Sequence, residues 1–212
     1  MKRVLLFISL FIIGFVFAIA FMHIHQQQTT QKIAERAKTS AFSLERAPTD
    51  SLQGKIATLS GTVNWQSRVA TQPAQIKKPR IIQQGEELRT GKDGTVSVQM
   101  HDGPLLTLLP NSHVNFIQTL PSSMVITQDQ GTVTYRTSGK AVSIESLSLL
   151  TILHDGMMTV SVDQTVDTAR IDVTNGNTTE AFNDSNNLSN VIPVTSGHAF
   201  LFSDDTLTGS VE

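Results

Sequence analysis

Hydrophobic and polar residues follow two different patterns along this chain. Residues 4–22 form an unbroken apolar run without a charged residue or a proline. From Gly54 onward, apolar and polar residues instead alternate in short runs. Alternation with a period of two places successive side chains on opposite faces of a β-strand. The pattern therefore predicts an apolar N-terminal helix followed by a β domain.

The apolar run has the length of a transmembrane helix. As a helix it spans roughly 29 Å, about the hydrocarbon thickness of a bilayer. We expect residues 1–3 to be a short cytoplasmic tail and residues 4–22 to be a single membrane anchor in contact with lipid. The alternative is a signal peptide that is cleaved after Ala20, because Ala18-Ile19-Ala20 fits the small-x-small cleavage pattern. Against cleavage, the apolar run continues for two residues past that position.

Residues 23–55 are interpreted as a polar linker. Apolar residues recur every three or four positions between Ile33 and Leu44, which predicts a helix that Pro48 ends at the latest. A spacer that continues the anchor is one interpretation, and a partner-binding helix is the other. The narrow apolar stripe favours the spacer.

Residues 56–212 are expected to form one all-β domain with no helix. The alternating runs cover residues 95–100, 132–135, 141–144, 158–162 and 170–173. Residues 105–109 are more continuously apolar, which is typical of a strand covered on both faces. The segment 182–188 is polar and rich in Asn, which predicts an exposed loop.

Turn signals separate the predicted strands, and each is a dipeptide that ends in glycine. They are Ser60-Gly61, Asp93-Gly94, Asp102-Gly103, Ser138-Gly139, Asp155-Gly156, Asn175-Gly176 and Ser196-Gly197. Glycine supplies the positive φ that tight turns require. Many short strands with a turn about every ten residues indicate an all-β fold.

Composition excludes several classes of function. The chain has no cysteine, which excludes disulfides, thiolate metal sites and cysteine nucleophiles. Its formal net charge is -2, and it has one Trp and one Tyr. Nucleic-acid binding relies on a basic field and, for single strands, on stacking aromatic side chains, so we expect no nucleic-acid partner.

Two His-Asp pairs are the first candidates for a catalytic or metal site, namely His101-Asp102 and His154-Asp155. Metal phosphohydrolases use such a pair, but they add further His and Asp ligands on a helical scaffold. Both pairs precede a glycine, so we interpret them as Asp-Gly turns at strand ends. We expect no catalytic residue, no cofactor and no metal ion, and therefore no enzymatic activity.

Other charged motifs have simpler interpretations. The adjacent carboxylates Glu86-Glu87 and Asp204-Asp205 would point to opposite faces of a strand. Residues 77–80, Lys-Lys-Pro-Arg, are expected to be a solvated basic loop. Contact of this loop with an anionic envelope polymer is the alternative.

The segment 85–112 carries a family resemblance. It reads GEELRTGKDGTVSVQMHDGPLLTLLPNS. This resembles the core of the FecR domain, which runs Gly-x-x-Leu-x-Thr-Gly, a short alternating strand, Asp-Gly, an apolar strand and Asn-Ser. The resemblance covers roughly residues 57–202. It implies an extracytoplasmic, twisted, solenoid-like all-β domain.

We therefore expect a single-pass membrane protein of the bacterial envelope with its C-terminal FecR-like domain outside the cytoplasm. We expect this domain to be a non-enzymatic interaction or sensory module that binds an envelope protein. The alternative is a structural domain that binds cell-wall glycan and does not signal. Founding members of the family carry a cytoplasmic domain that binds a sigma factor, whereas only residues 1–3 precede the anchor here. We do not expect this chain to control a sigma factor alone. The sequence leaves the partner's identity and the oligomeric state open.

Overall fold

The structure, a computed structural model, describes residues 47–212, which we call the β unit. Every regular element in this part of the chain is a strand, which confirms the all-β prediction for it. The predicted anchor and the predicted linker helix before residue 47 lie outside the described residues. Within residues 47–212, no helix is long and apolar enough to span a bilayer.

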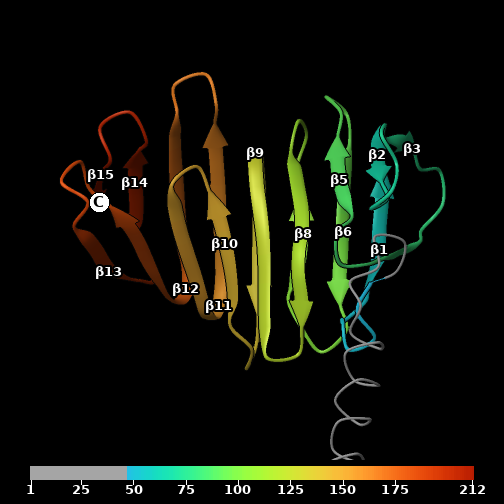
Figure 1. Cartoon of the computed structure of the whole chain (residues 1–212), viewed down its shortest axis with the longest axis horizontal. Coiled ribbons are helices and arrows are strands. Elements are labelled where there is room, and N and C mark those ends of the chain that lie inside the picture. The colour runs from blue at the N-terminus through green and yellow to red at the C-terminus, as the bar shows by residue number, and fades with distance from the viewer. Residues whose placement is uncertain (1–46) are drawn as a thin grey trace, which may run out of the picture. The chain divides into compact units, whose positions relative to one another are not determined.

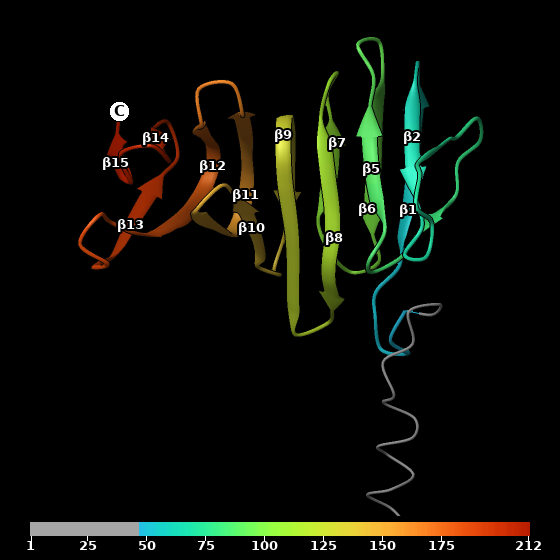
Figure 2. The same cartoon turned by 45° about the horizontal axis from the view of Figure 1, so that its top comes forward.

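The strands form one hydrogen-bonded sheet that is folded into two layers, A and B (Figure 2). Layer A contains β1 (Gly54–Ser60), β4 (Ile81–Ile82), β6 (Thr95–Met100), β7 (Leu105–Leu108), β14 (Ala199–Ser203) and β15 (Thr208–Val211). Layer B contains β2 (Val63–Gln66), β3 (Ala74–Gln75), β5 (Glu87–Thr90), β8 (His113–Leu120), β10 (Val142–Ser146) and β13 (Ser189–Thr195). Three long strands belong to both layers: β9 (Ser123–Thr137), β11 (Leu149–Asp163) and β12 (Thr168–Asn183).

Strand order follows the sequence from one end of the β unit to the other. Layer A runs β4-β1-β6-β7-β9-β11-β12-β14-β15, and layer B runs β3-β2-β5-β8-β9-β10-β11-β12-β13. Neighbours are antiparallel except β9 and β10, which are parallel. We call the end with β1–β4 the N-terminal end and the end with β13–β15 the C-terminal end (Figure 1).

Glycine makes the crossings between layers possible. The three long strands bend at Gly131, Gly156 and Gly176, whose φ angles are 84°, 109° and 84°. A Cβ atom at Gly176 would lie 1.8 Å from the carbonyl oxygen of Asp155, and one at Gly156 would lie 2.1 Å from that of Asn175. Only glycine fits such a close backbone approach at positive φ.

The prediction of turns at Asp155-Gly156 and Asn175-Gly176 is therefore wrong. Both glycines lie inside continuous strands, and they face each other in the β11–β12 register. The other five predicted Xaa-Gly turns do lie between consecutive strands. Positive φ is needed at a bend as well as at a turn, so the dipeptide alone does not distinguish them.

The core fills the space between the layers. Val96, Val98 and Met100 on β6 are at most 1% exposed, as the alternation predicted. On β11 the buried positions are odd-numbered before the bend and even-numbered after it. The register shifts at the bend, as at a β-bulge, so the inward face stays inward while the strand changes layer.

Three details differ from the predictions. Strand β7 is covered on one face, because Leu106 and Leu108 are fully buried while Leu109, just after the strand, is 38% exposed. Phe182, predicted to begin an exposed loop, is 8% exposed and belongs to β12. Strand β1 begins at Gly54, two residues before the predicted start of the β domain.

Candidate functional site

The segment that resembles a family motif forms a hydrogen-bonded corner between the layers. Thr90 Oγ1 donates to the carbonyl oxygen of Leu109 (2.6 Å) and accepts from the backbone N–H of Ser112 (2.8 Å). The backbone N–H of Asn111 donates to the carbonyl oxygen of Gly91 (3.1 Å). These residues hold β5, β7 and β8 together, so this part of the motif has a structural role.

A groove of about 850 Å³ lies beside the layer A edge at the N-terminal end, and we call it the N-terminal groove. Leu52 and Met100 contribute apolar side chains to its lining, and Ile81 on the edge strand β4 is 52% exposed. Lys55 and Arg80 also line it, whereas no Asp or Glu among residues 47–212 does. The groove therefore suits an apolar group next to a negative charge.

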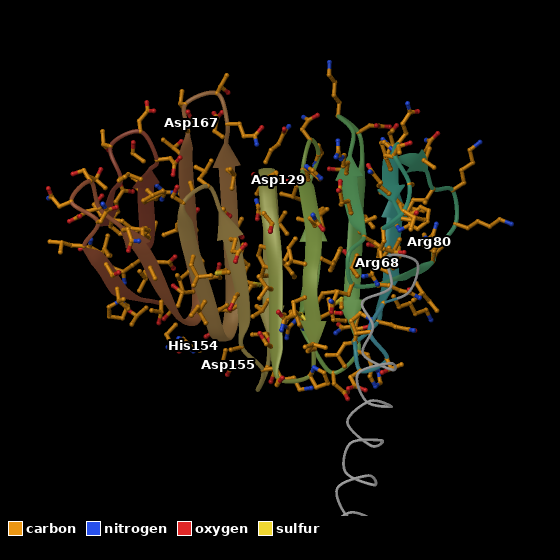
Figure 3. The ribbon with its side chains drawn as sticks, in the orientation of Figure 1. Arg68, Arg80, Asp129, His154, Asp155 and Asp167 are labelled. Atoms are coloured by element: carbon orange, nitrogen blue, oxygen red, sulfur yellow. The ribbon has the colours of Figure 1, made fainter. Side chains whose placement is uncertain are left out.

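A buried cluster anchors the loop beside this groove. Trp65 Nε1 donates to Glu86 Oε2 (3.0 Å), and the backbone N–H of Gln83 donates to the same oxygen (2.9 Å). The Arg80 guanidinium carbon lies 3.2 Å from the centroid of the Trp65 ring, a cation–π contact. Figure 3 shows Arg80 and Arg68 at the N-terminal end. The cluster fixes the backbone that precedes and includes β4.

A second charged cluster lies on the outer face of layer B. His113 Nε2 is 3.0 Å from Glu87 Oε2, and His113 Nδ1 is 2.8 Å from Asp129 Oδ2. Arg89 Nη2 is 2.8 Å from the same oxygen of Glu87. Burial raises the pKa of Glu87, but hydrogen bonds from Arg89 and His113 outweigh it, so the net direction is downward. Carboxylates occupy both imidazole nitrogens, so this cluster has no ring nitrogen free to act as a base.

A third group is buried near the C-terminal end. Glu180 is fully buried on β12, and Thr151 Oγ1 on β11 donates a hydrogen bond to its Oε2. Within the β unit, Glu180 Oε1 and Thr178 Oγ1 have no partner at full hydrogen-bond geometry. Burial raises the pKa of Glu180 to about 7, although the Thr151 and Thr178 hydroxyls oppose this. The only signal of this carboxyl in the sequence is its place at an inward position of an alternating strand.

The structure separates the two predicted His-Asp pairs. His101-Asp102 lies in the β6–β7 turn, with both side chains more than 70% exposed. His154-Asp155 lies inside β11 at the bend, where His154 Nε2 is 2.9 Å from Thr179 Oγ1. Figure 3 shows the second pair at the edge of the β unit away from Asp167. Within residues 47–212, no cluster of three or more His, Cys, Asp or Glu could hold a metal ion.

The two pairs of adjacent carboxylates, Glu86-Glu87 and Asp204-Asp205, lie in different kinds of structure. Glu86 is 7% exposed inside the cluster with Trp65, whereas Glu87 reaches the outer face, so the prediction of opposite faces is confirmed. Asp204-Asp205 instead lies in the β14–β15 turn, so strand geometry does not apply to it. Lys77 and Lys78 are exposed in the β3–β4 connection, as the solvated-loop interpretation predicted, whereas Arg80 of the same segment packs on Trp65.

The outer face of layer A carries hydroxyl groups rather than charges at its centre. Three cross-strand pairs have hydroxyl oxygens 3.1 Å apart: Ser97–Thr107, Thr132–Ser161 and Thr134–Thr159. Such pairs stabilise neighbouring strands and leave a level, polar surface.

Comparisons with known proteins support the fold and little beyond it. No protein-family model matches the chain, and no curated protein matches its sequence. Two crystal structures, at 2.50 Å and 1.65 Å resolution, are similar to the chain, and both are described as a putative anti-sigma factor from Parabacteroides distasonis ATCC 8503. Each has a TM-score of 0.50 and 12% sequence identity, over 59% of this chain and 58% of that one. This chain therefore matches little more than half the length of the Parabacteroides protein.

Proposed function

We propose that this chain is a membrane-anchored, non-enzymatic interaction module of the FecR type, with its β unit outside the cytoplasm of a bacterial cell. The observation that carries the proposal is the likeness of the fold to a protein described as an anti-sigma factor. The motif-like segment 85–112 supports the family, because its residues form the corner between the two layers. The apolar run at residues 4–22 supports the anchor.

The module works by presenting a surface to another envelope protein. Its charged clusters are paired within the β unit, and its two His-Asp pairs lie apart on β6–β7 and β11. The N-terminal groove offers apolar and cationic side chains together, which suits a protein ligand. The layer order, in which the chain passes repeatedly between the layers from one end to the other, supports the proposal of a twisted, solenoid-like domain.

Crosslinking in living cells tests this function. The tagged full-length chain is crosslinked, purified from the membrane fraction and analysed for co-purifying proteins. A chain of residues 1–46 fused to the same tag is the control for capture through the anchor. We expect one dominant envelope receptor or signalling protein that the control does not capture. Recovery of no protein other than this chain would contradict the proposal.

The hydroxyl-rich outer face of layer A favours one second candidate, a structural domain that binds cell-wall glycan. Hydroxyl arrays can exchange hydrogen bonds with sugar hydroxyls. Co-sedimentation of the tagged protein with purified cell wall at low salt tests this candidate. A protein that stays in the supernatant rules it out.

A further inference from the structure

The charges of the β unit are separated along its length. Residues 141–212 contain ten Asp and Glu but a single Lys or Arg, which is Arg170. Residues 47–140 contain nine Lys and Arg and six Asp and Glu. Because strand order follows the sequence, this asymmetry makes the N-terminal end basic and the C-terminal end acidic. The formal net charge of the whole chain is only -2, so the net charge alone does not reveal this separation.

Both ends of layer A are open strand edges. Among residues 47–212, β4 pairs only with β1, and β15 pairs only with β14. Ile81 on β4 is 52% exposed, and Val211 on β15 is 45% exposed. An unpaired edge with an exposed apolar side chain is a template for pairing with another strand.

The two edges carry complementary charges. Beside β4, the N-terminal groove is lined by Lys55 and Arg80 without an acidic residue. Beside β15, Asp205 is exposed in the turn and Glu212 follows Val211. Glu212 is held on the sheet by Arg170, whose Nη1 is 2.9 Å from Glu212 Oε2, and by backbone bonds to Ala199. The acidic edge is therefore part of the ordered sheet.

We propose that a second copy of this chain docks its β15 edge against the N-terminal groove and β4 of the first copy. Apolar contact between the exposed side chains of the two edges and attraction between acidic and basic residues hold the copies together. The layer A sheet then continues from one molecule into the next. This inference goes beyond the proposed function and does not depend on it.

The contact is heterologous, because each copy contributes a different edge. Such an interface repeats and produces open rows of molecules, unless the rotation between copies closes a ring. A symmetric dimer would instead join two identical edges. This difference gives the proposal a sharp geometric test.

Single cysteines test the geometry, since the chain has none of its own. Two full-length variants, Ile81→Cys and Val211→Cys, carry different tags and are expressed together. The cells are treated with a short, membrane-permeable bismaleimide crosslinker. We expect a mixed dimer of the two variants, and a ladder of oligomers when both substitutions are in one chain.

Val166→Cys is the matched control for Val211→Cys. Val166 is 58% exposed, but it lies in the β11–β12 connection and not at an open edge. Ile81→Cys should crosslink to Val166→Cys at least tenfold less than to Val211→Cys. Equal crosslinking to both, no mixed dimer, or dimers of one variant with itself would each overturn the proposal.

Charge reversal tests the electrostatic part. Lys55→Glu in the Ile81→Cys chain should lower the mixed-dimer yield several-fold, and 1 M salt should lower it in the unmodified pair. Lys92→Glu is the matched control, because Lys92 is exposed in the β5–β6 turn and lies outside the groove. An equal effect of the two reversals would overturn the role assigned to the groove.

Discussion

Each end of the β unit buries one glutamate, but the two side chains have different hydrogen-bond partners. At the N-terminal end, Glu86 accepts hydrogen bonds from Trp65 Nε1 and from the backbone N–H of Gln83, and Arg80 stacks on the same indole ring. Near the C-terminal end, Glu180 has a hydroxyl partner, Thr151, and no ion pair within the β unit. The first carboxylate is held by N–H donors beside a cation, whereas the second has its pKa raised to about 7 by burial.

This difference indicates how stability is distributed. The N-terminal end is built from short strands fixed by side-chain clusters, whereas Glu180 lies on β12, one of the long strands that bend through both layers beside the C-terminal end. Burial without a cationic partner disfavours the charged form of Glu180, so its ionisation is coupled to folding. The C-terminal end should therefore depend on backbone geometry and pH, and the N-terminal end on one hydrogen-bonded cluster.

The largest expected effect is at the bends. Gly176→Ala should lower the free energy of unfolding by about 4 kcal/mol or prevent folding, because the new Cβ meets the carbonyl oxygen of Asp155 at positive φ. Urea unfolding monitored by circular dichroism measures it. Gly139→Ala is the control: it has φ 75° but no atom within 4 Å of the new Cβ. Gly139→Ala should lower the free energy of unfolding by only about 1 kcal/mol. Equal losses would show that the close approach at the bend is unimportant.

The second effect is the pH dependence from Glu180. Its folded pKa of about 7 lies above the model-peptide value of 4.5, so the folded chain keeps a proton that the unfolded chain releases. Stability is therefore fully present below pH 4.5 and falls as the pH rises to about 7. At about 1.4 kcal/mol per pH unit, the loss is about 3 kcal/mol.

Glu180→Gln should remove this slope, and exposed Glu145→Gln on the neighbouring β10 should keep it. The measurement is the free energy of unfolding of each variant between pH 4 and pH 8. A slope that persists in Glu180→Gln would mean that other groups cause it.

The third effect is at the N-terminal end. Trp65→Phe removes the N–H that donates to Glu86 and weakens the stacking of Arg80, and it should lower stability by about 2 kcal/mol. Thermal unfolding at pH 7 measures this loss. A loss that appeared only above pH 7 would place the defect at the other end of the β unit.

The smallest expected effect on stability comes from the ion cluster of Glu87. Its lowered pKa means that its contribution is present above pH 4.5 and is lost as the pH falls through the lower folded value. Because Glu87 and Arg89 are partly exposed, the contribution should be less than about 1 kcal/mol. Glu87→Gln should therefore unfold at a slightly lower urea concentration than the wild type at pH 7, and this difference should shrink as the pH falls below 4.5. A difference that grew as the pH fell would contradict the assignment.

The alternating pattern predicts the strands well because each has one face in the core. Val133, Tyr135, Val160 and Ile171 are all fully buried at positions that the alternation assigns to one face. The bends were missed because Asp-Gly and Asn-Gly favour turns as strongly as bends. A readable signal was present, since the apolar positions of β11 change from odd to even numbers across Gly156.

The candidate site was less predictable, because it depends on contacts between distant strands. Trp65 meets Glu86 from another strand, and His113 meets Glu87 and Asp129 from two others. No local spacing encodes these contacts. The separation of acidic and basic residues was, in contrast, readable from the chain, but it gains meaning only when strand order is shown to follow the sequence.

The continuity of β9, β11 and β12 through both layers has a consequence for mutational tolerance. No loop residue intervenes at Gly131, Gly156 or Gly176, so the backbone itself sets the distance between the layers there. When a core side chain beside these bends is shortened, the layers have little freedom to move together and refill the space. Truncations such as Val160→Ala should therefore leave nearly the full void, at the upper end of the usual penalty for lost methyl groups. Core positions beside these bends should therefore tolerate substitution least.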